Sequence, residues 1–105
     1  MNDALSMAFP RIGSGLRRTA MASLPTPVTA HMIGLPSGTR NIMVKHDEAT
    51  NDVYGGNKMR KLEYLLGAAL AHETPYVATF GAADSNHALA TALHAAGLGL
   101  TPIAF

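Results

Sequence analysis

The sequence has no cysteine among its 105 residues. This absence excludes disulfide frameworks, zinc sites with thiolate ligands and cysteine nucleophiles. It is compatible with a reducing compartment, so the expected location is the cytoplasm. Long apolar runs are also missing, since no window approaches the roughly 20 residues that span a bilayer. Pro10, Gly13 and Arg17 interrupt the N-terminal segment, so neither a signal peptide nor a membrane partner is expected.

Charge of one sign is scarce as well. Charged residues make up 14% of the chain, the formal net charge is +1, and like charges come only in pairs such as Arg17-Arg18. A nucleic-acid surface needs a basic patch, so no nucleic-acid partner is expected. Hydrophobic residues, in contrast, make up 48%, which is enough for a buried core and excludes a disordered chain.

The first 40 residues and the remainder differ in pattern. Residues 1–40 contain four prolines and show no sustained helical or strand period, which predicts an extended N-terminal arm. Residues 41–105 alternate short apolar runs with helical periods. We expect strands over 41–46, 76–80 and 101–105 and helices over 57–72 and 87–96. On the first helix, Met59, Leu62, Leu65, Leu66 and Ala69 share one face.

This order predicts an α/β fold, with a parallel sheet buried on both faces by helices and joined by right-handed crossovers. The chain ends at Phe105, inside the last expected strand. Such an end leaves a sheet edge and apolar faces bare, so we expect residues 41–105 to be an incomplete domain of a longer enzyme.

Two polar loops follow strand ends, where α/β sheets bind ligands. The first, 55–61, places Lys58 after Gly55-Gly56 at a helix start. A helix N-terminus disfavours a cation, and an unprotonated amine is a nucleophile towards carbonyls. The alternative is that Lys58, Arg60 and Lys61 are only the solvated face of an amphipathic helix, and periodicity does not choose between the two.

The second loop, 81–87, presents free amides, the Ser85 hydroxyl and the Asn86 carboxamide to a ligand. Its alternative is that Asp84 or Ser85 merely caps the helix. No metal site is expected, because His46, His72 and His94 lack partners at ligand spacing.

Three segments carry a family resemblance: 44–48 (VKHDE), 55–63 (GGNKMRKLE) and 85–88 (SNHA). In this order and spacing they resemble the pyridoxal-phosphate (PLP) enzymes of the 1-aminocyclopropane-1-carboxylate deaminase and D-cysteine desulfhydrase family. The resemblance runs from about Leu24 to the end and covers only the N-terminal portion of the family's longer polypeptide. It implies the tryptophan-synthase-β-like fold (fold type II) and, for the full-length protein, a homodimer.

The resemblance also implies residue roles. Lys58 would form the Schiff base with PLP and shuttle protons at the substrate carbon, with Asn57 beside it in the cofactor site. Asn86 would hydrogen-bond the phenolic oxygen of the cofactor. Ser85 would stand beside the substrate as a proton relay or carboxylate binder. His87, also on the substrate side, follows the Ser-Asn-His wording of desulfhydrase-like members, whereas deaminase-like members tend to read Ser-Asn-Gln.

This chain departs from the family pattern at Asp84, where members usually carry Gln, and in the wording of residues 47–52. The glycine-rich phosphate loop and the residue facing the pyridine nitrogen are expected beyond residue 105, so these 105 residues alone are expected to be inactive. The expected reaction is α,β-elimination from D-cysteine, giving sulfide, pyruvate and ammonia, or deamination of 1-aminocyclopropane-1-carboxylate. Two alternatives stay open: another fold type II enzyme, similar to cysteine synthase or threonine dehydratase, and an inactive remnant that serves as a binding module.

Overall fold

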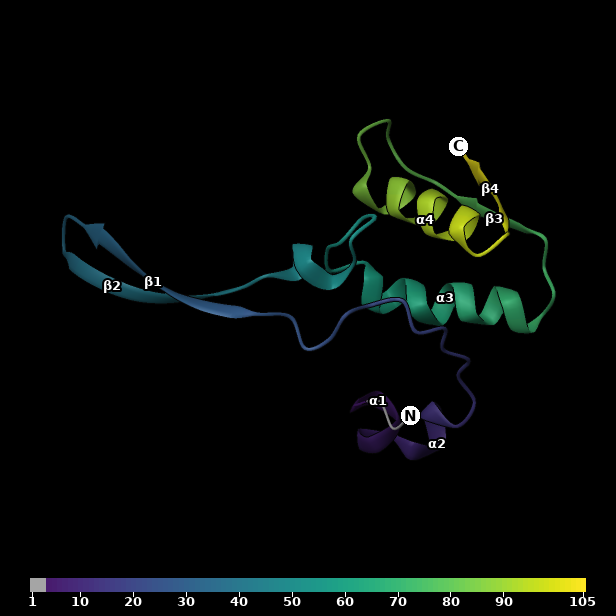
Figure 1. Ribbon diagram of the computed structural model, residues 1–105, viewed down its shortest axis with the longest axis horizontal. Helices are drawn as coiled ribbons and strands as arrows, with labels where there is room; N and C mark the ends of the chain where they lie inside the picture. Colours follow the sequence, from purple (N-terminus) through teal and green to yellow (C-terminus); the bar gives the residue numbers. More distant parts are fainter. Residues whose placement is uncertain (1–3) are drawn as a thin grey trace.

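The computed structural model describes residues 4–105, which form an elongated molecule with axes of 55 × 37 × 20 Å. Figure 1 shows three parts: a small pair of N-terminal helices, a long hairpin that projects to one side, and an α/β body. The N-terminal pair is α1 (Ala4–Ala8) and α2 (Pro10–Gly13). No helix among residues 4–105 is long and apolar enough to cross a membrane.

The body follows the predicted order closely. It consists of α3 (Met59–Ala71), β3 (Tyr76–Thr79), α4 (Asn86–Gly97) and β4 (Thr101–Ala104). The strands β3 and β4 pair in parallel, with Tyr76 opposite Thr101, and α4 is the crossover between them. The α/β class, both helices and these two strands are therefore confirmed to within about two residues at each end.

The core of the body lies between α3, α4 and the turn before β4. Leu62 and Leu66 of α3 pack with Ala90, Ala95 and Leu100, and all five are buried. The three- and four-residue steps of α3 put most of the predicted face inwards. Leu65 is the exception, because its side chain is 52% exposed.

The hairpin corrects the expected organisation of the N-terminal half. Strand β1 (Val28–Leu35) pairs antiparallel with β2 (Gly38–Lys45) along the whole length of both. Gly38, at φ +116°, supplies the left-handed conformation that the tight turn requires. Residues 4–40 therefore contain regular structure, and residue 40 lies inside β2, while the division of the chain into an arm and an incomplete domain stays a prediction.

The expected strand 41–46 lies in β2, but it does not belong to the parallel sheet. A tight turn keeps β1 and β2 adjacent, so they pair with each other, and the described parallel sheet has only β3 and β4. Its strands are not buried on both faces either, since Tyr76 of β3 and Ile103 of β4 are 59% and 40% exposed. Helix α4 covers one side, and no described element covers the other.

A single buried carboxylate fixes the segment before the hairpin to α3. Glu63 accepts hydrogen bonds from Arg18 Nε at 2.6 Å and from the backbone N–H groups of Met21 and Ala22, each at 2.7 Å. Burial of the carboxyl opposes its ionisation, but these hydrogen bonds outweigh burial and hold the pKa of Glu63 below its ordinary value. Glu63 therefore ties residues 18–22 to the helix that follows the first loop.

We predict that Glu63→Gln lowers the free energy of unfolding by about 2 kcal/mol or more, because a charged acceptor of three hydrogen bonds becomes a neutral group. Urea titration at neutral pH measures the change. Glu73→Gln is the matched control, since Glu73 is exposed after the end of α3 and its substitution should be nearly neutral. An equal effect of the two substitutions would contradict the assigned role of Glu63.

The stability contributed by Glu63 should also depend on pH. Because the folded-state pKa is depressed, this contribution is fully present above the ordinary value of 4.5 and is lost as the pH falls through the lower folded-state value. Between neutral pH and strongly acidic pH, the wild-type chain should lose more stability than Glu63→Gln. Urea midpoints at several pH values measure this difference, and parallel curves would refute it.

Candidate functional site

The loop before α3 is held from inside by Thr50, at the end of a short 3₁₀ turn over Asp47–Thr50. The hydroxyl of Thr50 is fully buried, donates to the carbonyl of Asp47 at 2.8 Å and accepts from Gly56 N–H at 2.9 Å. Gly55 passes so close to this turn that a Cβ there would lie 1.9 Å from the carbonyl oxygen of Glu48. The glycine pair is therefore required by close backbone approach and by the φ of +122° at Gly56.

Lys58 occupies the N-cap position of α3, one residue later than the predicted cap Asn57. Its side chain is half-buried, and its ammonium makes no hydrogen bond or ion pair with any described residue. Asn57 is exposed. The amino group of Lys58 is therefore unpaired among the described residues, and its role as a nucleophile stays a prediction.

Arg60, two residues further along the chain, is not merely part of a solvated helix face. Its guanidinium donates to Asp47 Oδ1 at 2.8 Å, and Lys45 donates to the same oxygen at 3.2 Å. The hydrogen bond from Arg60, followed by that from Lys45, holds the pKa of Asp47 below its ordinary value despite partial desolvation. Arg60 therefore fastens the start of α3 to the end of the hairpin, whereas Lys61 is exposed.

The second loop begins at Gly81 and ends at the start of α4. Ser85 Oγ accepts from Ala88 N–H at 3.2 Å, so Ser85 is the N-cap, as one of the two interpretations held. This bond uses only the oxygen of the hydroxyl, and the hydrogen stays free to donate. Asp84 is exposed and makes no described ion pair.

Residues 81–86 line an open pocket of about 710 Å³. Ala104 and Phe105 at the end of β4 and one side of α4 complete its wall. Ser85 and Asn86 both reach this pocket, whereas Lys58, Asn57 and His87 are not among its lining residues. The pocket therefore belongs to the second loop alone.

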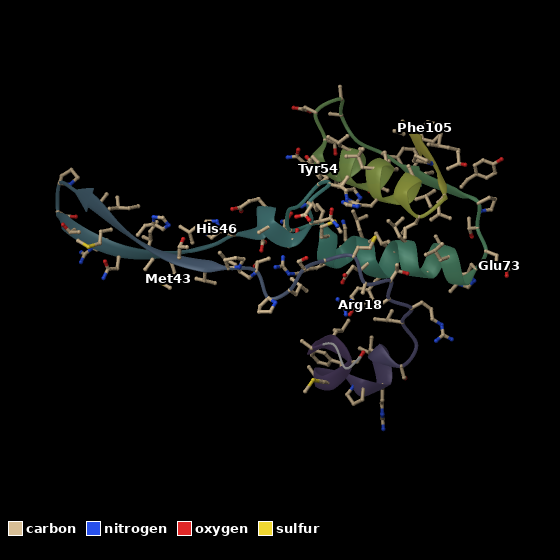
Figure 2. The ribbon with its side chains drawn as sticks, viewed as in Figure 1. Arg18, Met43, His46, Tyr54, Glu73 and Phe105 are labelled. Carbon is tan, nitrogen blue, oxygen red and sulfur yellow. The ribbon has the colours of Figure 1, made fainter. Side chains whose placement is uncertain are left out.

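Tyr54 joins the two loops. Its hydroxyl donates to Asn86 Oδ1 at 2.7 Å, and its backbone carbonyl accepts from the ring nitrogen Nε2 of His94 at 2.9 Å. Figure 2 shows Tyr54 beside α4, close to the loop that precedes the helix. Neither contact of Tyr54 was predicted, and His94 was considered only as a metal ligand, because no local spacing links residues 32 and 40 positions apart.

His87, at the end of the second loop, lies within electrostatic reach of the lysines of the first loop. Burial of the ring, followed by the positive charges of Lys61 and Lys58, lowers the pKa of His87. Its ring nitrogen Nδ1 is buried and has no hydrogen-bond partner in the described part of the chain. The structure thus brings Lys58 within electrostatic reach of His87, and Asn86 into contact with Tyr54. The described residues contain no group of three or more His, Asp or Glu side chains placed to hold a metal ion.

Comparison with known proteins finds relatives in the family that the three sequence segments resemble. A protein of Pyrococcus abyssi named as a 1-aminocyclopropane-1-carboxylate deaminase is 44% identical over 98 residues, which are 93% of this chain and 28% of that protein. The bifunctional D-cysteine desulfhydrase/1-aminocyclopropane-1-carboxylate deaminase of Arabidopsis thaliana is 42% identical over 70% of this chain and 18% of its own. No family model matches the chain.

A solved structure agrees with the sequence comparison. The crystal structure of an ACC deaminase homologue superposes on 99% of this chain and 31% of that chain, with a TM-score of 0.75 and 34% identity. The chain belongs to the 1-aminocyclopropane-1-carboxylate deaminase and D-cysteine desulfhydrase family. The resemblance and the expected family fold are confirmed.

Within the deaminase and desulfhydrase family, the chain spans less than a third of the length of the relatives that it matches. The two motifs, 55–63 and 85–88, cover the ends of the two loops that Tyr54 joins and the first residues of α3 and α4. The role of each residue in the site stays a prediction, as do the phosphate-binding residues expected beyond residue 105.

We predict that Gly55→Ala destabilises the first loop, because the new Cβ meets backbone rather than a movable side chain. Overpacking of this kind costs about 1–3 kcal/mol. The matched control is Gly97→Ala at the end of α4, where nothing lies within 4 Å of an added Cβ. Thermal unfolding should show a lower midpoint for the first variant and an unchanged or higher midpoint for the second. The reverse order would contradict the close approach at Gly55.

Proposed function

We propose that the chain supplies the lysine-bearing part of a PLP-dependent enzyme that acts on a small amino acid. The observation that carries this proposal is the hydrogen bond between Tyr54 and Asn86, which brings the Ser85-Asn86 loop to the loop that bears Lys58. The names of the relatives support the substrate class, since they refer to 1-aminocyclopropane-1-carboxylate and D-cysteine. A cytoplasmic location and a homodimeric full-length enzyme are parts of the same proposal.

The donor set of the two loops fits PLP. The cofactor presents an aldehyde and an anionic phenolic oxygen, and the substrate presents a carboxylate. Lys58 offers an amine without a described partner, for the aldehyde. Asn86 accepts from Tyr54 through Oδ1, so its NH₂ group is the end left to donate to an anionic oxygen. Ser85 retains its hydroxyl hydrogen for a carboxylate.

When bound, PLP withdraws electrons from the substrate α-carbon. The residues of this chain then bind the substrate and transfer protons. Lys58 is the base and acid at the substrate carbon, and Ser85 holds the substrate carboxylate or relays a proton. Asn57 lies next to Lys58 on the cofactor side of the proposed site. The lowered pKa of His87 keeps its ring neutral at pH 7, so no further cation adds to the positive charges of Lys58 and Lys61.

Between the two reactions, the proposal favours D-cysteine desulfhydration, because His87 gives the Ser-Asn-His wording of desulfhydrase-like members. Asp84 bears on the same choice. It replaces the usual glutamine on the pocket wall, and a carboxylate there adds negative charge beside Ser85. Ring-opening deamination is the second reaction in the proposal.

The test is PLP binding by the full-length protein, because the phosphate-binding residues are expected beyond residue 105. Schiff-base formation with Lys58 should give visible absorbance that Lys58→Ala abolishes and Lys61→Ala retains, since Lys61 is exposed and serves as the matched control. Spectra recorded at increasing PLP concentration measure both the band and the affinity. Equal absorbance of the wild-type chain and Lys58→Ala would overturn the assignment of Lys58, and equal loss in both variants would show that the lysines act only through general charge.

A further inference from the structure

Tyr54 makes two contacts with one helix. Its carbonyl accepts from His94 Nε2 and its hydroxyl donates to Asn86, two residues of α4 that are eight positions apart. Eight residues advance about 12 Å along a helix axis, so Tyr54 lies lengthwise against two turns of α4. A residue held by its backbone carbonyl and by its side-chain hydroxyl in this way has little freedom to move relative to the helix.

The contact at His94 is the fixed end. A carbonyl oxygen only accepts, so His94 must carry its proton on Nε2. The ring is buried, and a buried histidine that lost this acceptor would leave an unsatisfied donor. The backbone of Tyr54 is thus set at one height along α4, which determines how far the phenol reaches.

The contact at Asn86 is the functional end. An amide side chain has an accepting and a donating end, and a half-turn about its terminal bond exchanges them. Tyr54 donates to Oδ1, which leaves the Nδ2 hydrogens as the exposed end. Without the phenol hydroxyl, both orientations become available, and the flipped one would turn a carbonyl oxygen towards an anionic ligand.

We propose that Tyr54 is a positioning residue, anchored by His94, that orients the Asn86 amide so that its NH₂ group faces the phenolic oxygen of the cofactor. This inference rests on the proposed function for the identity of the ligand. It assigns the donor orientation at Asn86 to a residue outside both loop motifs. Tyr54 itself need not touch the cofactor.

The first arm of the test needs no ligand. In the wild-type chain, the NMR order parameter of the Asn86 side-chain amide should be high, and Tyr54→Phe should lower it while the backbone spectrum is retained. Tyr76→Phe is the matched control, because Tyr76 is exposed on β3 and its substitution should leave the Asn86 amide unchanged. An unchanged order parameter in Tyr54→Phe would overturn the inference.

The second arm uses PLP and its 3-deoxy analogue, which lacks the phenolic oxygen. Tyr54→Phe should weaken PLP binding by about tenfold, the loss of one hydrogen bond to a charged group, and should leave binding of the analogue nearly unchanged. Asn86→Asp keeps an acceptor for Tyr54 but has no NH₂ group, so it should show the same selective loss. An equal loss for both ligands would assign Tyr54 a merely structural role and overturn the inference.

The two arms separate the inference from the function. If no PLP binds to the full-length wild-type protein, the proposed function fails, and the order parameter still decides whether Tyr54 orients Asn86. If PLP binds at Lys58 and Tyr54→Phe changes neither readout, the function stands and the positioning role is wrong.

Discussion

The attachment of Tyr54 to α4 is the interaction on which the rest of the site depends. Lys58 follows Tyr54 by four residues, with a glycine pair between them, and its charge reaches His87 in the first turn of α4. Two contacts at separate points of one helix define both position and angle, whereas one contact would leave a pivot. The geometry of the candidate site therefore follows from a pair of hydrogen bonds that neither loop makes by itself.

A second set of contacts holds α3 to segments that precede it in the chain. Glu63 accepts hydrogen bonds from residues 18–22, and Asp47 accepts them from Arg60 and Lys45. These two carboxylates fix the N-terminal half of α3 to the segments before and after the hairpin. Both carboxylates are held ionised by their donors. Among the neighbouring cations Lys58 is therefore the one with an unpaired, half-buried amino group. Arg60 is paired with Asp47, and Lys61 faces solvent.

Local signals in the sequence were enough for the body of the fold. The helical steps of α3, the cap at Ser85 and the short apolar runs of β3 and β4 each lie within one element, so periodicity predicts them. The hairpin was missed because Val28 and Met32 are apolar on one face of β1 while Ile33 and Leu35 are apolar on the other, which hides the two-residue period. The contacts of Tyr54 were missed because they join distant segments and leave no local pattern.

We propose that the two loops meet to make Lys58 the reactive amine of the chain. Borohydride reduction in the presence of PLP fixes the cofactor to whichever lysine has formed a Schiff base, and peptide mass spectrometry then locates it. In the full-length protein we expect a pyridoxyl group on Lys58 at a PLP concentration where Lys45 and Lys61 are still unmodified. Labelling spread evenly over the three lysines, or confined to one of the other two, would contradict it.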